Sequence, residues 1–430
     1  MEKRETKIGF IREYLDAYYP DAIRYDEVTD KLQVAEDATE PESDAVATTS
    51  GRRWKELNKR MINTIVCECA TLSGKNITDR EVRTVLLSGE IPSVHPLRDY
   101  VHSLPAYKPS SGDWIAELAN QVKVVSDQER WVKVFTKWFV GMVASWMDDE
   151  VVNQHVLVLI GKQGIYKTTW LERLLPPELR SYGTKMSNLH DLSKDDRLRI
   201  SESALINIDE IDALTDRELN QMKSIITSAD VNERAAYAYN KERHVRLASF
   251  CASGNKREFL TDTTGNRRWL PFEVESIESP FLHPTLPYKL YYAQAWWLVQ
   301  NGFNYWFDTD DIRALEEHTE SFRRETSEEQ LLPIYYTAVP SSNESAVFRT
   351  TAEISAQLVY HGNIKHPMDL RALGRVMAQQ GFVSKRLRGS GPRGFLVIEN
   401  QVNSSTALEL AKRIREEEMS ADKPSVPSVF

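Results

Sequence analysis

Cysteine is scarce in this sequence of 430 residues, which has only Cys67, Cys69 and Cys251. Their spacing contains no Cys-x-x-Cys pair, which argues against a disulfide framework and against a cysteine-based zinc site. No stretch approaches the roughly 18 consecutive apolar residues of a membrane span. The first residues, 1–7, also lack the apolar core of a secretory signal. These absences predict a cytoplasmic protein with no membrane partner.

Positive charge is also in deficit, because the formal net charge is −9. This total argues against a protein covered with nucleic-acid-binding charge. The distribution is uneven, however: residues 345–399 contain eight Lys or Arg against three Asp or Glu. Positive charge is therefore concentrated near the carboxyl end. The length itself predicts two or three domains.

One stretch, residues 156–170 (VLVLIGKQGIYKTTW), has an apolar β-branched run, a turn with glycine and the start of a helical pattern. It predicts a strand, a phosphate-binding loop and a helix, following the pattern G-x-x-x-x-G-K-[ST]. Tyr166 stands where the pattern has its second glycine, and we expect Gly164 to supply the missing backbone freedom. The alternative is a buried strand and helix with a solvated lysine. The predicted nucleotide-binding residues are Gly161, Gly164, Tyr166, Lys167, Thr168 and Thr169.

A second apolar run, residues 204–212 (ALINIDEID), ends in carboxylates, as a Walker B strand does. We expect Asp209, with Thr168, to hold Mg²⁺ and Glu210 to activate the attacking water. The 42-residue step from Lys167 to Asp209 leaves room for a helix and one more strand. Both runs can then end at the same edge of a parallel sheet, where such folds bind ligands. The predicted cofactors are ATP and Mg²⁺.

Two further segments carry candidate catalytic residues. The predicted strand 244–253 is followed by Asn255, whose amide would sense the γ-phosphate, although such a residue is often only part of a turn. Arg267 and Arg268 follow a Gly-Asn turn, and their guanidinium groups could reach phosphate. The alternative for the arginines is a structural ion pair.

The carboxyl-terminal pattern reads helix, turn, helix and hairpin, which is typical of a winged helix that binds duplex DNA or, alternatively, protein. Its wing would present Lys385, Arg386, Arg388 and Arg393. The overall expectation is an α/β fold, a P-loop ATPase core with a parallel sheet, preceded by an α-helical domain and followed by the winged helix. The expected ranges are 1–50 (helix, hairpin, acidic linker), 51–150 (α-helical domain), 151–280 (ATPase core), 281–340 (helical connector), 341–400 (winged helix) and 401–430 (charged helix and tail).

These motifs, together with the run from Asp262 to Arg268 (DTTGNRR), resemble the virulence-associated protein E family over roughly residues 90 to 275. Members are P-loop ATPases of phages and integrated mobile elements, similar to superfamily-three replicative helicases of the AAA+ class. The carboxyl region looks like the winged-helix segment that accompanies such ATPases in some Bacteroidetes elements.

The resemblance implies that Lys167 and Thr168 bind nucleotide and Mg²⁺, that Asp209 and Glu210 serve metal and water, and that Asn255 is the sensor. It implies an arginine finger, Arg267 or Arg268, acting between subunits of a ring, which would be a hexamer. The turn with Lys241 and Arg243 stands where related helicases carry a pore hairpin that grips single-stranded DNA. No primase signature is evident, so any primase would be a separate chain.

The expected function is an ATP-driven DNA helicase or translocase for replication initiation of a phage or mobile element. One alternative is a P-loop ATPase switch in defence or assembly that remodels proteins. Another is a nucleotide-regulated DNA-binding protein.

Overall fold

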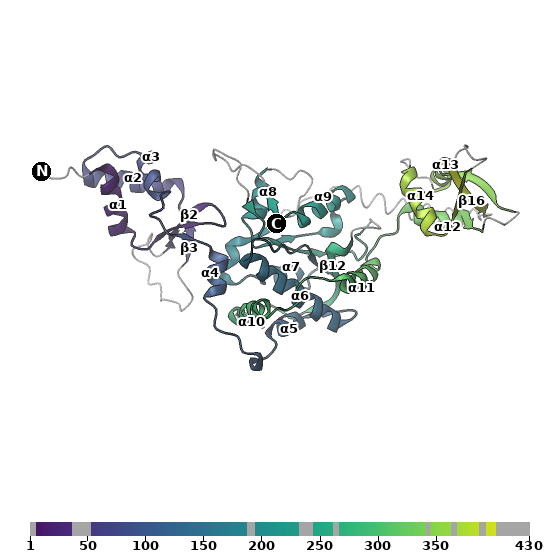
Figure 1. The fold of residues 1–430 in the computed structure, drawn as a ribbon, viewed down its shortest axis with the longest axis horizontal. Coiled ribbons are helices and arrows are strands. Elements are labelled where there is room, and N and C mark those ends of the chain that lie inside the picture. Colours follow the sequence, from purple (N-terminus) through teal and green to yellow (C-terminus); the bar gives the residue numbers. More distant parts are fainter. Residues whose placement is uncertain are drawn as a thin grey trace. The chain divides into compact units, whose positions relative to one another are not determined.

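The computed structural model describes residues 6–36, 53–186, 194–231, 244–260, 266–340, 345–362, 368–386 and 393–400. The chain separates into two units, Met1–Glu258 with Thr264–Phe322, and Phe259–Thr263 with Arg323–Phe430 (Figure 1). Within the described ranges, no helix combines the length and apolar content that crossing a lipid bilayer requires.

A six-stranded sheet forms the centre of the first unit. In spatial order its strands are β5 (Val122–Val124), β12 (Trp269–Ile277), β6 (Val156–Ile160), β11 (Ser249–Gly254), β8 (Leu205–Ile208) and β7 (Gly183–Met186). All neighbours run parallel except β5, which pairs antiparallel with β12 at one edge. The expected α/β fold with a parallel sheet is therefore confirmed.

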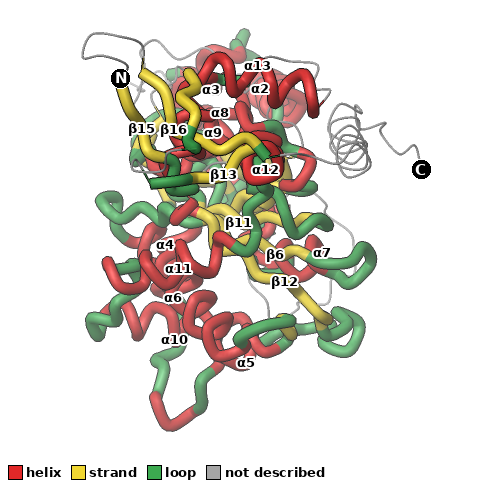
Figure 2. The backbone as a smooth tube through the Cα atoms, turned by 90° about the vertical axis from the view of Figure 1, so that its right-hand side faces the viewer, coloured by secondary structure: helices red, strands yellow, loops and turns green. Residues whose placement is uncertain are grey.

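Both faces of this sheet are covered by helices, as the continuous apolar strands require. Helices α5 (Trp114–Asn120), α6 (Gln128–Met147) and α10 (Tyr288–Gln300) lie on one side, with α8 (Lys194–Ser201) and α9 (Asp216–Thr227) on the other (Figure 2). Asp127 caps the start of α6, because its carboxylate accepts a hydrogen bond from the backbone N–H of Arg130. Trp131 and Trp138 on α6 are fully buried. The aromatic residues of this helix are thus core residues.

The amino-terminal elements have a hydrophobic core of their own. They are α1 (Lys7–Tyr18), β1 (Ile23–Asp26), β2 (Lys31–Ala35), β3 (Trp54–Glu56), α2 (Lys59–Ser73), α3 (Asp79–Leu86) and β4 (Ser93–Val94). Ile11, Ile62 and Val82 bring α1, α2 and α3 into this core, and β3 pairs with β2. This differs from the expected boundary at residue 50, because elements on both sides of it share one sheet and one core.

The helices after this core do not form a separate α-helical domain. Together with α4 (Pro96–His102), α5 and α6 join the core of the six-stranded sheet, whereas the 3-10 turn η2 (Pro109–Ser111) is exposed. The ring of Trp131 on α6 packs against Phe272 of β12, with centroids 5.1 Å apart. Helix α10 joins the same core through Tyr292, which packs on Phe139 and Trp146. Its neighbour α11 (Thr309–Glu320) contacts β12, so residues 288–320 are part of the core and not a connector.

The predicted strand 244–253 is divided into β10 (His244–Val245) and β11, and β10 pairs with β9 (Asp230–Val231). Arg246, between the two pieces, is 1% exposed, and its guanidinium donates to the carbonyls of Asn153, Ile226, Ser228 and Ala248. This buried cation lies where the strand is interrupted, at residues 246–248. Short 3-10 turns complete the unit: η3 (Pro177–Tyr182), η4 (Ile211–Ala213) and η5 (Asn266–Arg268).

The second unit has the helix, helix and hairpin order expected for residues 351–398. Its elements are α12 (Ser327–Tyr335), β13 (Tyr336–Ala338), β14 (Val347–Thr350), α13 (Thr351–Gly362), α14 (Leu370–Gln379), β15 (Val383–Arg386) and β16 (Arg393–Glu399). Strand β16 pairs antiparallel with β13, β14 and β15. Leu332 of α12 shares a core with Ile354 and Leu373. The unit therefore begins before the expected start at residue 341, and the predicted helix and tail at 401–430 lie outside the described residues.

Candidate nucleotide-binding site

The loop 161–166 connects β6 to α7 (Lys167–Glu172), so the predicted order of strand, loop and helix is present. Gly161 is required there, because an added Cβ would lie 2.8 Å from the carbonyl oxygen of Val274. Tyr166 has φ +68° and Gly164 has φ +83°. A non-glycine residue in this left-handed region is strained by about 1–2 kcal/mol. Gly164 thus has the positive φ that was expected of it, but Tyr166 adopts positive φ as well.

Lys167 is the buried cation of this loop, with 7% of its surface exposed. Its Nζ lies 2.7 Å from the carbonyl oxygens of both Gly161 and Lys162, and 3.3 Å from Oδ1 of Asn255. Burial lowers the pKa of Lys167, and the nearby carboxylates oppose this effect. The predicted phosphate ligand thus contacts the predicted sensor.

A hydroxyl and carboxylate cluster lies beside the lysine. Thr168 Oγ1 lies 3.3 Å from Asp209 Oδ1 and 3.0 Å from Ser253 Oγ, and the Ser253 hydroxyl donates to Asp209 Oδ1 at 2.7 Å. Lys185 forms an ion pair with Asp209 Oδ2 at 2.7 Å. Burial opposes ionisation of Asp209, but hydrogen bonds from Lys185 and Ser253 outweigh it and lower the pKa of Asp209. Asp209 is therefore held as a carboxylate.

The segment after β8 positions two more acidic residues. Glu210 is exposed and adopts φ +54°, a second strained non-glycine residue at the site. Asp212 accepts hydrogen bonds from the backbone N–H groups of Asn255 (3.0 Å) and Lys256 (3.2 Å). An added Cβ on Gly254 would lie 2.7 Å from Asp212 Oδ1, so glycine permits this close approach.

The structure thus brings most predicted site residues to one edge of the sheet, where β6, β8 and β11 end. The register pairs Gly254 of β11 with Ile160 of β6, and Ala252 with Ile208 of β8. Thr169 lies in the first turn of α7. The residues that converge at this edge are Gly161, Lys167, Thr168, Asp209, Glu210 and Asn255.

Arg267 and Arg268 lie elsewhere, at the opposite edge of the same sheet. They precede β12, whose first residue, Trp269, pairs with Val156 at the start of β6. The loop 161–166 follows the other end of β6, about 13 Å further along the strand at 3.3 Å per residue. His155 stands at the arginine edge, where burial and the charges of Arg267 and Arg268 lower its pKa to about 4.

Three residues of this site were not predicted from the sequence: Lys185, Asp212 and Ser253. Asp212 and Ser253 had a signal, since each stands two or three residues from a predicted site residue along the chain. Lys185 had none. Its proximity to Asp209 depends on the parallel pairing of β7 with β8, where Lys185 lies opposite Asn207.

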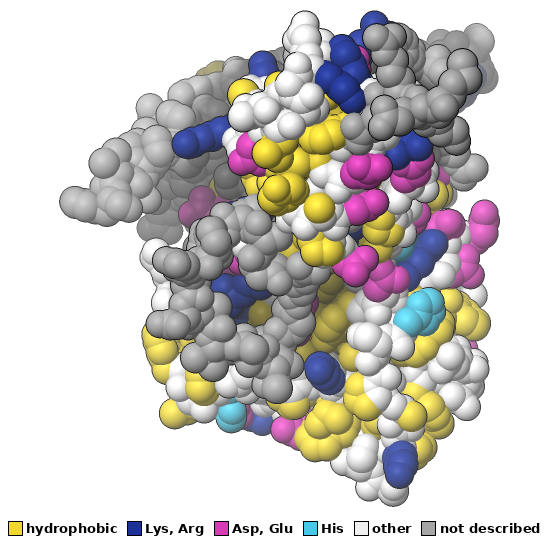
Figure 3. Space-filling model, turned by 90° about the vertical axis from the view of Figure 1, so that its left-hand side faces the viewer, with side chains coloured by type: hydrophobic (Ala, Val, Ile, Leu, Met, Phe, Trp, Pro, Cys, Tyr) yellow, Lys and Arg dark blue, Asp and Glu magenta, His cyan; other side chains and the backbone are white. Residues whose placement is uncertain are grey.

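The predicted DNA-binding residues are only partly described. Lys385 and Arg386 are exposed on β15, and Arg393 at the start of β16 donates from Nε to Ser384 Oγ at 2.9 Å. Lys241, Arg243 and Arg388 lie outside the described residues. On the face shown in Figure 3, visible Lys and Arg side chains are interspersed with Asp and Glu and are not gathered into one surface.

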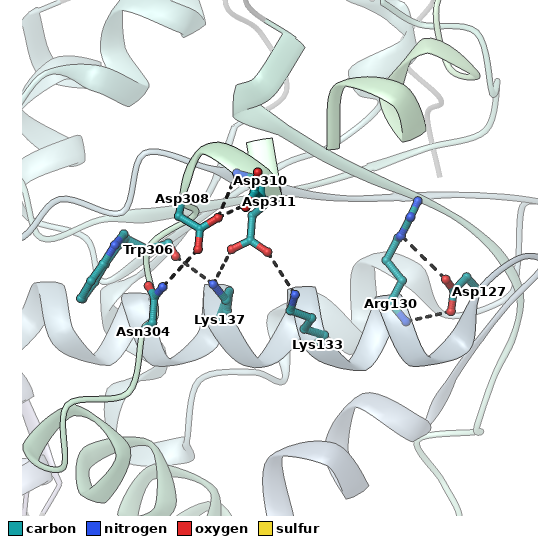
Figure 4. Close-up of polar contacts among 9 residues, drawn as sticks. All are labelled: Asp127, Arg130, Lys133, Lys137, Asn304, Trp306, Asp308, Asp310 and Asp311. Carbon is teal, nitrogen blue, oxygen red and sulfur yellow. Dashed lines mark hydrogen bonds and ion pairs between the residues drawn. The ribbon is translucent and has the colours of Figure 1, made fainter. Parts of the chain in front are cut away.

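A cavity of about 320 Å³ lies between α6 and α11, and none of the predicted site residues lines it. Its wall contains a buried ion pair, Lys137 Nζ to Asp311 Oδ2 at 2.5 Å, and Lys137 also donates to the carbonyl of Trp306 (Figure 4). Lys133 approaches the other carboxylate oxygen from solvent. Since its charges are paired across the two helices, we assign this cluster the structural role of fixing α11 to α6.

Comparison with known proteins gives a family and no close relative. A strand, loop and helix followed by two carboxylates at one edge of a parallel sheet define an α/β protein with a candidate nucleotide site. The virulence-associated protein E-like domain matches residues 107–324, slightly more than half of the chain. The chain belongs to this family. A search of curated proteins gave no match.

Solved structures of the NrS-1 C-terminal region are similar over most of the chain. Two apo structures, one of them an A form, cover 92% and 93% of this chain and 100% of their own, with 10% identity and TM-scores of 0.43 and 0.42. A further A-form apo structure has 10% identity and a TM-score of 0.45, and covers 92% of this chain and 100% of its own. TM-scores below 0.5 do not define a common fold.

Proposed function

We propose that this protein is a Mg²⁺-dependent P-loop ATPase that drives movement on DNA, as a helicase or translocase for replication initiation of a phage or mobile element. The observation that carries the ATPase part is the convergence of Lys167, Thr168, Asp209 and Asn255. Lys167 lies within hydrogen-bond distance of Asn255, and Thr168 lies within hydrogen-bond distance of Asp209. Phosphoryl transfer needs chiefly positioning and charge neutralisation, which such a set supplies. The DNA part rests on the family resemblance and on the basic carboxyl-terminal region.

The oxygen atoms at this edge fit Mg²⁺, which prefers hard oxygen ligands and uses few protein carboxylates beside the substrate phosphates. Thr168 Oγ1 and Asp209 Oδ1 converge with the Ser253 hydroxyl. When bound, the metal neutralises charge on the β- and γ-phosphates. Lys167 would exchange its carbonyl partners for phosphate oxygens, and the exposed Glu210 would orient and activate water.

The test compares nucleotide binding with turnover, using calorimetry and phosphate release. Lys167→Ala should abolish detectable ATP binding, because it removes phosphate neutralisation. Glu210→Gln should retain binding and stop turnover, because it removes only water activation. Lys162→Ala is the matched control: this exposed lysine contributes its backbone carbonyl to Lys167, and its substitution should have a much smaller effect. Equal loss of ATP affinity in the Lys167 and Glu210 variants would contradict these roles.

The strained Tyr166 favours one second candidate, a nucleotide-regulated DNA-binding protein that turns over ATP poorly. A strand-displacement assay with ATP, run beside the ATPase assay, separates the possibilities. Unwinding supports the helicase. Turnover without unwinding supports a protein-remodelling switch, and binding without turnover supports the regulator.

A further inference from the structure

Two exposed aromatic rings lie at the rim of the loop 161–166. Tyr166 is 38% exposed and Phe281 is 82% exposed. Their ring centroids are 6.4 Å apart, and the rings are nearly perpendicular at 83°. Phe281 belongs to the segment 278–287 that connects β12 to α10. Single exposed apolar side chains are common on protein surfaces, but these two contact each other beside the predicted phosphate-binding loop and form one apolar surface that a ligand could cover.

The position of Phe281 is fixed by α7 and does not depend on its own side chain. The guanidinium of Arg173, which follows α7, donates to the carbonyls of Pro280 (3.0 Å) and His283. In return, the Tyr288 hydroxyl at the start of α10 donates to the carbonyl of Arg173 at 2.9 Å. The segment that carries Phe281 is thus bound on both sides to the helix that begins with Lys167.

Tyr166 is equally constrained. It immediately precedes Lys167, and its spacing of four and seven residues from Trp170 and Arg173 sets the three on one side of α7. These three residues line the same small recess as Pro280. Glycine would remove the left-handed strain at Tyr166, so the retained ring indicates a use for it.

We propose that Phe281, held edge-to-face against Tyr166, provides a stacking platform for the base of a nucleoside triphosphate whose phosphates bind at residues 161–168. This inference rests on the proposed ATPase function and adds how the base is held. Aromatic faces stack on any base because every base has a π-face. The polar side chains that line the recess beside these rings have partners in the protein. Gln121 Oε1 accepts from the Trp170 indole at 3.1 Å, Arg173 binds carbonyls, His283 Nε2 lies 3.0 Å from Glu278 Oε2, and Ser279 Oγ accepts from the backbone N–H of Phe281. The platform therefore holds ATP and GTP with similar strength.

The experiment is calorimetry with Mg²⁺ and three ligands, ATP, GTP and inorganic tripolyphosphate, on the full chain. Stacking predicts that wild-type protein binds ATP and GTP within about threefold of each other and more tightly than tripolyphosphate. Phe281→Ala should weaken both nucleotides by about 5- to 150-fold and leave tripolyphosphate unchanged. Phe281→Trp should restore nucleotide affinity. Leu282→Ala is the matched control, since Leu282 is 72% exposed on the same segment and should leave all three affinities unchanged.

The outcomes separate this inference from the proposed function. Nucleotide binding that is undiminished in Phe281→Ala, or equal wild-type affinity for ATP and tripolyphosphate, overturns the platform and leaves the ATPase proposal standing. A preference for ATP over GTP of 100-fold or so also overturns it, because that requires hydrogen-bonded base recognition. If neither ATP nor tripolyphosphate binds wild-type protein, the proposed function fails and this inference fails with it.

Discussion

Asp212 Oδ1 lies 3.0 Å from the backbone nitrogen of Asn255, so a carboxylate that follows β8 holds the residue that follows β11. Asp212 stands only two residues from Glu210, and Asn255 contacts Lys167. The proposed water-activating residue and the proposed sensor are therefore linked through two residues of backbone and one hydrogen bond. In the proposed ATPase, this link would couple the end of β8 to the end of β11 when the γ-phosphate changes.

This link predicts that Asp212→Ala lowers ATP turnover more than ATP affinity. Both acceptor oxygens are removed, the segment with Asn255 shifts, and misplacement by about 1 Å can reduce a rate on the order of 100-fold. Steady-state kinetics and calorimetry would measure the two effects. Asp212→Asn keeps one acceptor oxygen and should be affected less. Wild-type turnover by Asp212→Ala would reduce this hydrogen bond to a structural one.

Arg267 and Arg268 lie at the far edge of the sheet from the candidate nucleotide site. We therefore expect that the one of them that is the arginine finger acts on the nucleotide of a neighbouring subunit. Each alanine variant alone should lose on the order of 10³-fold or more in turnover if it is the finger. Mixing that variant with Asp209→Ala should restore up to about a quarter of wild-type activity, the share of ring interfaces with an intact site.

The control mixture is Lys167→Ala with Asp209→Ala, whose defects fall in the same site and should not complement. Mixed rings must be verified by mass spectrometry. Absence of recovery for both arginine variants in verified mixed rings would assign Arg267 and Arg268 to structural roles.

The lowered pKa of His155, about 4, predicts acid sensitivity of the first unit. Between about pH 6.5 and pH 4 the unfolded chain binds a proton at this histidine and the folded chain does not. The free energy of unfolding should therefore fall as the pH falls, by up to about 1.4 kcal/mol per pH unit. Urea unfolding of wild type and His155→Gln would isolate this slope. Arg267→Gln should raise the pKa of His155 in an NMR titration, and an unchanged pKa would contradict the electrostatic contribution.

The two lysines that contact Asp311 should differ in importance for stability. Lys137→Met leaves a largely buried carboxylate without its closest partner and should cost about 3 kcal/mol. Lys133→Met removes a lysine whose side chain is 66% exposed and should cost less than about 1 kcal/mol. Chemical denaturation measures both. Equal costs would show that Lys133 can take over the inner position.

The second unit should bind duplex DNA through the exposed basic residues of β15. A chain ending at Phe322 should lose duplex affinity and keep basal ATPase activity, whereas a cut at residue 345 would leave Leu332 without its core partners. Lys385→Ala with Arg386→Ala should reduce the log–log salt slope of binding by about 0.9 for each DNA phosphate that the protein no longer neutralises. Equal duplex affinity of full and shortened chains at one salt concentration would reassign the unit to protein binding.

The sequence predicted the site where local pattern and strand order were sufficient. The apolar runs before Gly161 and Asp209 predicted two parallel strands ending at one edge, and Tyr166 occupies a position that the pattern reserves for glycine because it needs positive φ. Lys185 was beyond prediction, since only the β7–β8 pairing brings it to Asp209. The expected domain boundary at residue 50 was wrong for a similar reason. Strands β2 and β3 pair across the long acidic segment that separates them in the sequence, so that Val34 of β2 lies opposite Lys55 of β3.

Arg246 has a consequence for how the first unit opens. Its guanidinium donates hydrogen bonds to carbonyls in three segments: Asn153 before β6, Ile226 and Ser228 at the end of α9, and Ala248 before β11. Displacement of any one segment would leave a buried cation short of acceptors, and burial already lowers the pKa of Arg246 to about 10. We therefore expect backbone amides in these three segments to exchange with deuterium together, as one cooperative opening, and not in the order of their separate exposures.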